Sequence, residues 1–346
     1  MLSIIITILI FPFLPFFMYG NLMNNASQNL LKQSQVLGEA SAQQNKNDLY
    51  SDGESKVFQH HNLFLLDKVD GAEFTPIRKA DFSDIKIWSR ASVVIDVNSK
   101  TILHYDKGRE QTQIASLTKL MTATLVLENI KNLDEPVTIT PEMLDVDGTT
   151  VGCPTSVYCN DKKLRVGEQI SVKNLLEAML LDSANDAATA LGIHAAGSTD
   201  KFVNMMNAKA KKLGLKDTHF CTPSGLEITG HENECYSSAY DVARIAAYSL
   251  KYNLIWDMMR TSEATVHSVD GKYTHKLKNT DMLLNKMPDC IGGKTGFTPL
   301  AGKSLMLGAV SPIGKHRVIA VILDDPNRWD DMKNLINWTF NNYQWQ

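Results

Sequence analysis

The segment Gln113-Ile-Ala-Ser-Leu-Thr-Lys-Leu-Met-Thr-Ala-Thr-Leu-Val-Leu-Glu128 predicts a helix with a wide apolar band, uninterrupted by Gly or Pro. Ser116 and Lys119 lie near its start, three positions apart, a spacing that places both side chains on one helical face. A hydroxyl is a weak nucleophile at neutral pH, but a neighbouring amine that burial or a second cation keeps neutral can take its proton. This pair therefore predicts a serine nucleophile with a lysine base.

Two further short motifs follow this segment along the chain, Ser183-Ala-Asn185 and Lys294-Thr-Gly296. A single Ser-x-x-Lys pair proves little, because the same pattern occurs at Ser83 and Lys86, where a solvated pair is the simplest interpretation. Lys-Thr-Gly, by contrast, occurs once in the chain. We therefore interpret the three motifs, taken in this order, as parts of one active site.

The composition argues against several other functions. The chain has 346 residues, of which 44% are hydrophobic, enough for one large domain or two small ones. A formal net charge of −3 provides no basic field for nucleic acid. The sequence contains neither a glycine-rich phosphate loop nor a His-Glu-x-x-His helix, and its nine His are scattered. We therefore expect no cofactor, no metal and no nucleic-acid partner.

The first residues, Met1–Gly20, are almost wholly apolar, and no charged side chain precedes Lys32. This pattern predicts a secretory signal peptide or an N-terminal membrane anchor, and hence action outside the cytoplasm. A buried core helix is the alternative, but the extreme terminal position disfavours it. The missing positive n-region and the residues Pro12 and Pro15 are atypical of both, so that cleavage and anchoring stay open.

Residues 21–88 are rich in Asn, Gln, Ser and charged side chains. Such a composition is typical of a polar linker, with at most short structured pieces such as Leu63–Leu66. Its expected function is to give the catalytic domain, residues 89–346, reach from the membrane.

The five cysteines fit an exported protein without proving export. Cys153 and Cys159 flank a short turn that contains Pro, and Cys221 and Cys235 bracket another loop, which leaves Cys290 unpaired. Two disulfides and five free thiols are therefore both open at this point.

Hydrophobic periodicity predicts a chain with strands at both ends of the catalytic region and helices between them. The expected strands are residues 91–97, 102–105, 291–297, 303–310 and 316–323. The expected helices, besides 114–128, are residues 172–181, 186–196, 202–213, 238–250 and 328–343, with Ser171 as an N-cap and Gly214 as a C-cap. The economical solution is an α+β fold, one antiparallel sheet with packed helices and a separate, mostly helical lobe.

The sequence segments around the three motifs resemble those of the low-molecular-mass D-alanyl-D-alanine carboxypeptidases, which are penicillin-binding proteins related to serine β-lactamases. The resemblance rests on Ala115-Ser-Leu-Thr-Lys-Leu-Met-Thr122, Ser183-Ala-Asn-Asp-Ala187 and Gly293-Lys-Thr-Gly-Phe-Thr298. Phe202-Val-Asn-Met-Met-Asn207 and Ser224-Gly-Leu226 extend it. It implies a β-lactamase/transpeptidase-like fold from about Ser89 to Tyr343.

The resemblance also implies roles for the reacting groups. Ser116 would attack the carbonyl between the two terminal D-Ala residues of a peptidoglycan stem peptide, with Lys119 as general base. Ser183 would relay a proton to the departing amine. The backbone N–H groups of Ser116 and Phe297 would form the oxyanion hole.

The remaining motif residues are expected to bind substrate. The Asn185 amide would hold Lys119 and a substrate backbone group, and Lys294 and Thr295 would bind the terminal carboxylate. Gly296 would let the substrate lie against the strand edge. For each residue alone, capping or a solvated position is the simpler alternative. β-Lactam antibiotics are implied as covalent inhibitors.

Many members of this family carry a second β-rich domain and a C-terminal amphipathic membrane helix, whereas this sequence stops at Gln346, directly after the expected closing helix. We therefore expect any membrane attachment to use Met1–Gly20, if it is uncleaved.

Three other functions compete with a carboxypeptidase. A class A β-lactamase needs a Glu-x-x-x-Asn loop between the second and third motifs, and none of the Glu residues there has Asn four positions on. A D,D-endopeptidase acting on crosslinks cannot be separated by motifs. A penicillin-sensing or wall-binding domain without turnover is disfavoured by the intact Ser116 and Lys119.

Overall fold

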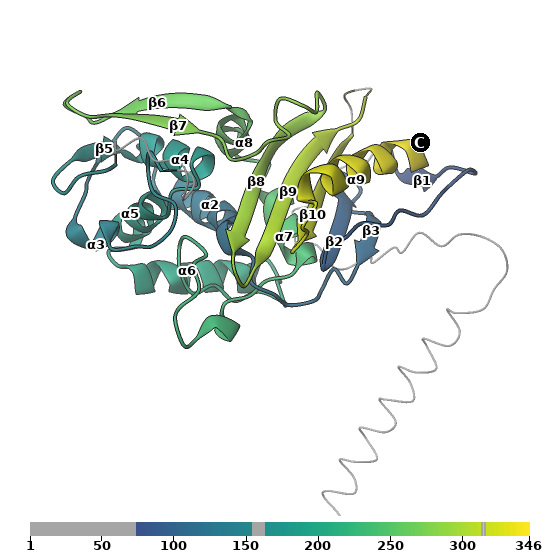
Figure 1. The fold of residues 1–346 in the computed structure, drawn as a ribbon, viewed down its shortest axis with the longest axis horizontal. Coiled ribbons are helices and arrows are strands. Elements are labelled where there is room, and N and C mark those ends of the chain that lie inside the picture. Colours follow the sequence, from purple (N-terminus) through teal and green to yellow (C-terminus); the bar gives the residue numbers. More distant parts are fainter. Residues whose placement is uncertain (1–73, 154–162, 313, 315) are drawn as a thin grey trace, which may run out of the picture. The chain divides into compact units, whose positions relative to one another are not determined.

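In the computed structural model, which describes residues 74–153, 163–312, 314 and 316–346, strands from both ends of the catalytic region form one sheet (Figure 1). Its five antiparallel strands have the order β3-β2-β10-β9-β8. Their bounds are β2 (Ala91–Asp96), β3 (Ile102–Asp106), β8 (Cys290–Thr298), β9 (Gly302–Val310) and β10 (Arg317–Leu323). All five predicted strands of the sheet are confirmed.

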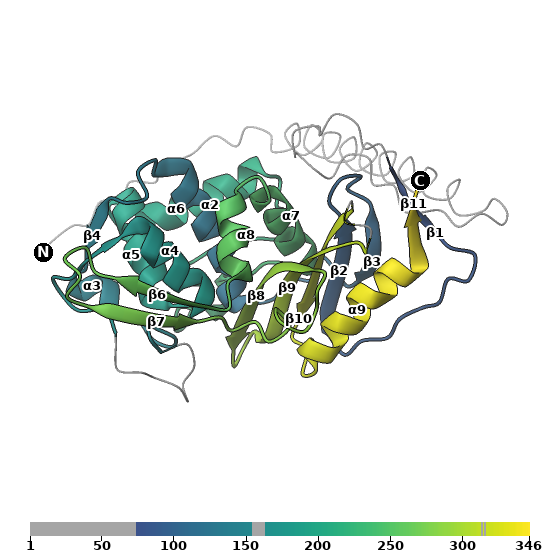
Figure 2. The same cartoon turned by 90° about the horizontal axis from the view of Figure 1, so that it is seen from above.

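Both faces of this sheet are buried, because alternate residues of its central strands enter two different apolar clusters. On one face, Val93, Ile319 and Val321 join the cluster that includes α7 (Ala239–Ser249) and α8 (Asn253–Arg260). On the other face, residues such as Val94, Leu305, Val318 and Ile322 pack against α9 (Arg328–Asn342). Figure 2 shows the sheet between these helices.

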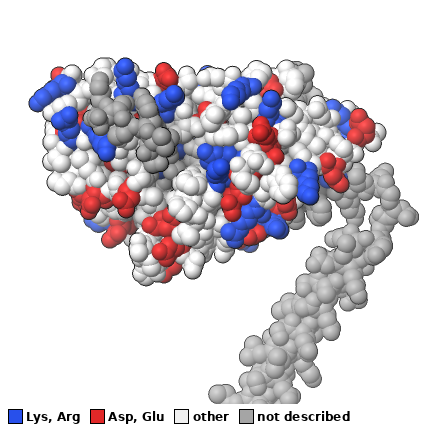
Figure 3. Space-filling view, in the orientation of Figure 1, with Lys and Arg blue, Asp and Glu red and all other residues white. Residues whose placement is uncertain are grey.

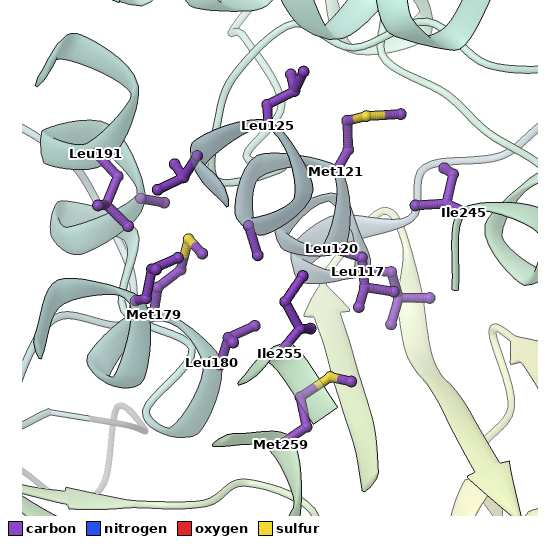
Figure 4. Packing of buried hydrophobic residues seen from close by; sticks show 14 of the residues in the cluster. Leu117, Leu120, Met121, Leu125, Met179, Leu180, Leu191, Ile245, Ile255 and Met259 are labelled. Carbon is purple, nitrogen blue, oxygen red and sulfur yellow. The ribbon is translucent and has the colours of Figure 1, made fainter. Parts of the chain in front are cut away.

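The helical lobe surrounds α2 (Lys119–Asn129), in which all eight residues from Lys119 to Val126 are buried. A helix that is apolar all round belongs at the centre of a domain. Figure 4 shows its side chains against residues of the neighbouring helices, among them Met179, Leu191 and Ile255. Each such fully buried aliphatic side chain contributes roughly 1.5–3 kcal/mol. The predicted apolar band therefore fixes the position of the motif at its start.

The other elements of the lobe are short strands and helices that lie between β3 and β8 along the chain. They are α3 (Pro141–Leu144), α4 (Val172–Leu181), α5 (Asn185–Ala196), α6 (Thr199–Lys212), the 3-10 turn η2 (Glu232–Glu234) and the pairs β4–β5 (Pro136–Thr138, Gln169–Ser171) and β6–β7 (Glu263–His267, Thr274–Lys278). The α+β fold with a mostly helical lobe is thus confirmed, whereas the β6–β7 hairpin was not predicted.

Two predicted helix caps are present. The Ser171 hydroxyl accepts a hydrogen bond from the Asn174 backbone N–H at 3.2 Å, and α4 starts at the next residue. Gly214 has φ +65°, and the following Leu215 N–H returns to the Ala210 carbonyl at 2.9 Å, which closes the end of α6.

The part of the predicted linker that the structure describes, residues 74–88, lies on the catalytic domain. Its strand β1 (Pro76–Arg78) pairs with β11 (Tyr343–Trp345), two residues of which follow the predicted final helix. Phe82 packs at the cluster around α9, and the Trp88 backbone N–H donates to Asp331 at 2.8 Å. The linker was predicted from the mostly polar composition of residues 21–88 as a whole, and that composition did not reveal the apolar residues near its end. The segments 1–20 and 21–73 lie outside the described residues.

The cysteines are resolved in part. Cys221 and Cys235 form a disulfide with a Cα separation of 5.4 Å, so the alternative of five free thiols is wrong. Cys153 is disulfide-bonded, but its predicted partner Cys159 lies outside the described residues, and this pairing stays a prediction. Cys290 is a buried free thiol.

The surface of the described residues shows mixed charge and one sizeable cavity. In Figure 3, Lys and Arg side chains are interspersed with Asp and Glu over the face that is drawn. A cavity of about 880 Å³ lies between β3 and residues 78–87, and Tyr240 and Trp338 also line it. None of the predicted site residues lines this cavity. Among the residues that the structure describes, no helix combines the length and apolar character needed to cross a bilayer.

Candidate active site

Ser116 lies in η1 (Ala115–Thr118), a 3-10 turn that leads into α2. The sequence predicted one continuous helix here, and the difference arises at Ala115, whose φ is +47°. Two glycines enclose the turn: a Cβ on Gly225 would lie 2.0 Å from the Ala115 carbonyl oxygen, and one on Gly296 would lie 2.8 Å from that of Ile114. The serine is therefore presented by a turn held between a loop and β8.

Lys119 is fully buried directly behind this serine. Its Nζ lies 2.8 Å from Ser116 Oγ, 2.7 Å from Asn185 Oδ1 and 2.8 Å from the Ser224 carbonyl oxygen. Burial, followed by the nearby Lys294 cation, holds the pKa of Lys119 well below its usual range, while Asp186 acts in the opposite direction. These surroundings favour the neutral amine.

The three partners also orient a neutral amine. It has two N–H donors and one lone pair, and the carbonyl oxygens of Asn185 and Ser224 can only accept. When they take both donors, the lone pair faces the Ser116 hydroxyl at 2.8 Å. This is the geometry that a general base needs.

Ser183 lies between α4 and α5, opposite the Ser116 turn, and is itself in the left-handed region with φ +59°. Its carbonyl accepts from the Thr149 hydroxyl at 2.6 Å, and its Oγ accepts from Lys294 Nζ at 2.8 Å. A non-Gly residue held in this conformation is often found at functional sites. Its side chain is thereby held beside Lys294.

Lys294, on β8, is the second buried lysine of the site, with 1% of its surface exposed. Besides Ser183, its Nζ donates to the Thr295 carbonyl at 3.1 Å. Burial, then the Arg328 guanidinium, lowers the pKa of Lys294 to about 7, and the Asp281 carboxylate opposes that shift. Arg328 comes from the start of α9 and donates to the Gly296 carbonyl at 3.1 Å.

The β8 strand forms an edge of the sheet among the described residues, so that one of its sides is not paired with another sheet strand. The Thr295 hydroxyl lies 2.6 Å from that of Thr280, and the Phe297 side chain is 60% exposed. Thr298 donates to Glu227, which ties the strand end to the loop that carries Ser224. An unpaired strand edge beside a nucleophile suits an extended peptide.

The structure thus brings the residues predicted for catalysis and substrate binding to one place. Lys119 is hydrogen-bonded to Ser116 and Asn185, Lys294 is hydrogen-bonded to Ser183, and Thr295, Gly296 and Phe297 continue along β8.

Three further groups at the site were missed from the sequence: the Ser224 carbonyl, Asp186 and Arg328. A backbone carbonyl has no side-chain signature, although Ser224-Gly-Leu226 was part of the family resemblance. Asp186 directly follows the second motif, and this adjacency was a usable signal. Arg328 begins a distant helix, and nothing in its local sequence indicates the site.

A half-buried serine hydrogen-bonded to a buried lysine beside an edge strand, on a sheet flanked by helices, defines a hydrolase that works through a serine nucleophile. The chain belongs to the D-alanyl-D-alanine carboxypeptidase family of serine peptidases, peptidase S11, whose family model matches residues 78–327. The family predicted from the motifs is therefore confirmed.

Individual relatives agree with this assignment. The chain is 31% identical over 270 residues to the D-alanyl-D-alanine carboxypeptidase DacF of Bacillus subtilis, with 76% of this chain and 64% of that protein covered. It is 32% identical over 247 residues to a D-alanyl-D-alanine endopeptidase of Escherichia coli, covering 70% of this chain and 73% of the relative. It therefore spans just under two thirds of the length of DacF.

Solved structures share the fold. The DD-transpeptidase of Streptomyces K15 superposes with a TM-score of 0.67 at 28% identity, over 75% of this chain and 99% of that one. The predicted transpeptidase-like fold is confirmed. The names of these three similar proteins cover a carboxypeptidase, an endopeptidase and a transpeptidase.

Proposed function

We propose that this chain is a serine D,D-carboxypeptidase that removes the terminal D-Ala from peptidoglycan stem peptides through an acyl-enzyme on Ser116. The observation that carries this proposal is the triple contact of the buried Lys119 Nζ with Ser116, Asn185 and Ser224. Family membership supports the substrate class, because the family is named for the D-Ala-D-Ala terminus.

Acylation follows from this geometry. Ser116 Oγ attacks the carbonyl carbon of the penultimate D-Ala while its proton passes to the lone pair of Lys119. The backbone N–H groups of Ser116 and Phe297 stabilise the developing oxyanion. Ser183 Oγ, which accepts from Lys294, gives its proton to the departing D-Ala amine and regains one from the Lys294 ammonium.

Deacylation uses the same groups in reverse. After D-Ala leaves, the Lys119 ammonium passes the proton that it took from Ser116 through solvent to the Lys294 amine, so that both lysines regain their starting charge. A water molecule then takes the place of D-Ala, and the neutral Lys119 removes a proton from that water as it attacks the ester carbonyl and returns this proton to Ser116 Oγ as the ester bond breaks. The product is the shortened stem peptide, and Ser116 recovers its hydroxyl proton. Carboxypeptidase, endopeptidase and transpeptidase reactions share the first half of this scheme and differ in the leaving group or the acceptor.

The terminal carboxylate of the substrate is bound at Lys294 and Thr295. Lys294 is buried and has a pKa of about 7, so an incoming carboxylate favours its charged form. Arg328, which is held by the Gly296 carbonyl on the same strand, adds positive potential from behind. The D-configured residue at a peptidoglycan crosslink can present a carboxylate at the same place. D,D-endopeptidase activity is therefore the alternative, and the name of the Escherichia coli relative supports it.

The same chemistry makes β-lactams covalent inhibitors of this chain, because they acylate Ser116 and deacylate slowly. Peptidoglycan lies outside the cytoplasmic membrane, so the enzyme acts there. The Cys221–Cys235 disulfide supports an oxidising compartment. Residues 1–20 act as a secretory signal or, if they are not cleaved, attach the protein to the membrane, and a linker begins at residue 21.

The test uses the full chain and a peptide that ends in D-Ala-D-Ala. D-Ala release is measured for the wild type and for Ser116→Ala, with a labelled penicillin as a parallel probe of acylation. Release that disappears in the variant, together with stable labelling of the wild type, supports the carboxypeptidase.

Other outcomes separate the alternatives. Labelling without D-Ala release, followed by cleavage of crosslinked muropeptides, favours the endopeptidase. Labelling without turnover of either substrate favours a penicillin sensor. Neither release nor labelling in folded protein would overturn the Ser116 mechanism.

A further inference from the structure

The second motif faces a six-residue segment, Asp147–Gly152, that carries no motif of its own. Two fully or almost fully buried carboxylates that flank the motif hold this segment. Asp186, 2% exposed, accepts from the Val151 backbone N–H at 3.0 Å, and Asp182, 0% exposed, accepts from that of Gly152 at 2.9 Å.

The segment in turn holds the motif. The Asn185 backbone N–H donates to the Thr149 carbonyl at 2.7 Å, and the Thr149 hydroxyl donates to the Ser183 carbonyl at 2.6 Å. Most importantly, Asn185 Nδ2 donates to the Asp147 carbonyl at 2.7 Å. The two stretches are thus joined by reciprocal hydrogen bonds, several of them charge-assisted.

This junction determines which end of the Asn185 amide reaches Lys119. Because Nδ2 is occupied by the Asp147 carbonyl, Oδ1 points to Lys119 Nζ at 2.7 Å. If the segment moved away, the amide would be free to rotate and could present a donor to the amine. Lys119 would then lose one of the two acceptors that direct its lone pair at Ser116.

We propose that Asp186, through the Asp147–Gly152 segment, is a positioning residue for the reaction, because it fixes the orientation of the Asn185 amide and hence of the Lys119 base. The proposal rests on the proposed Ser116–Lys119 mechanism and assigns a function to a segment that lies outside all three motifs. Asp182 supports the same segment and also accepts from the Lys278 backbone N–H at 2.6 Å, which links it to β7.

Asp186→Asn tests the proposal, because the amide keeps one acceptor oxygen for the Val151 and Ala187 backbone N–H groups but removes the charge. It also places an NH2 group where Oδ2 accepts from the Val151 N–H at 3.2 Å. Asp241→Asn is the matched control. Asp241 is likewise 0% exposed, in the first turn of a helix, and accepts from the Asp217 backbone N–H at 2.8 Å. Both variants lose stability, but only Asp186→Asn should lower kcat/KM, by about ten-fold or more.

The pH profile gives a readout that lost stability does not move. The charged groups that act on the Lys119 pKa are Lys294 and Asp186. Loss of the Asp186 charge and loss of the Asn185 acceptor each disfavour the charged form of Lys119 and so lower its pKa. The acid limb of kcat/KM should therefore shift to lower pH. The Asp241→Asn limb should stay in place.

Gly148→Ala keeps the test decisive if Asp186→Asn does not fold. Gly148 is exposed, has φ +82°, and a Cβ there would lie 2.9 Å from Asn185 Nδ2. Gly167→Ala is its control, since Gly167 has φ +83° and no atom within 4 Å of the added Cβ. We expect Gly148→Ala to acylate about ten-fold more slowly than Gly167→Ala.

Acylation by a labelled penicillin separates this inference from the proposed function. If the wild type is labelled but releases no D-Ala, the carboxypeptidase proposal fails, while the ratio of acylation rates still tests the positioning role. Acylation rates of Asp186→Asn and Gly148→Ala within two-fold of their controls, with an unshifted acid limb, would overturn it.

Discussion

The Lys119 Nζ atom lies 2.8 Å from the backbone carbonyl oxygen of Ser224 and therefore donates to an acceptor that no side-chain substitution removes. The Gly225 that follows packs so closely on the turn of the nucleophile that a Cβ there would lie 2.0 Å from the Ala115 carbonyl oxygen. The base is consequently positioned by the backbone of one loop and by the amide of Asn185 at the start of α5.

Lys119→Arg should abolish acylation, because a guanidinium stays protonated and cannot accept the Ser116 proton. A general base contributes about 10²–10⁴-fold, so labelling by penicillin should slow by at least about 10²-fold. Lys209→Arg is the control, since Lys209 is also a buried lysine, 8% exposed, but binds Glu128 away from the site. A Lys119→Arg protein that labels as fast as Lys209→Arg would contradict the assigned role.

The affinity for a substrate carboxylate should weaken above neutral pH. Lys294 has a pKa of about 7 in the free enzyme, so it loses its charge as the pH rises through that value. We expect kcat/KM to fall by up to about ten-fold per pH unit above this point, once Lys119 is neutral. Steady-state kinetics from pH 5 to 10 measure this limb.

Lys294→Arg provides the control for that pH limb. Arginine keeps its charge throughout this range, so the variant should show no decline. Its plateau should be lower, because the side chain differs in shape and a guanidinium cannot return a proton to Ser183. A wild-type profile that stays flat up to pH 10 would show that Lys294 does not supply the carboxylate site.

Loss of the Cys221–Cys235 disulfide should destabilise the protein. The bond is separated by 14 residues in sequence, and closing a loop of that size contributes about 3 kcal/mol. The double variant Cys221→Ser/Cys235→Ser should therefore unfold at lower urea concentration, and reduction of the wild type should lower the midpoint at least as much, because it also breaks the disulfide of Cys153. An unchanged urea midpoint in both experiments would exclude a stabilising bond.

Phe82→Ala should destabilise the catalytic domain without changing its chemistry. Phe82 lies in an edge-to-face arrangement with Trp338, at 5.6 Å between ring centroids, and with Tyr343 at 6.2 Å. Because the side chain is only half-buried, we expect a loss of about 2 kcal/mol, less than the 3–5 kcal/mol for a fully buried Phe. Thermal unfolding measures the loss, and kcat per folded molecule should be unchanged. A stability equal to that of the wild type would show that residues 74–88 do not stabilise the catalytic domain and behave as part of the linker.

The sequence predicted the sheet and the main helices because their apolar residues recur with the period of each element. It also predicted which eight residues meet at the site, since the motifs are short and their order is informative. Both kinds of signal are local, and they held where local pattern and tertiary structure agree.

What was missed depends on contacts between distant residues. The 3-10 turn at Ser116 follows from the positive φ of Ala115 beside Gly225, which no periodicity records. The pairing of β1 with β11 joins strands that are each three residues long, too short for a pattern to emerge. Arg328 reaches the site only because α9 starts beside β8.

The order of the strands in the sheet has a consequence for when the enzyme becomes reactive. The central strand β10 is the last of the five along the chain, yet it lies between β2, the first, and β9. A chain that emerges from its N-terminus therefore exposes Ser116 long before Lys294 and β10 exist to complete the cleft. Ser116 therefore has no complete active site around it until almost the whole catalytic domain has been synthesised, so that only the complete domain is expected to be reactive.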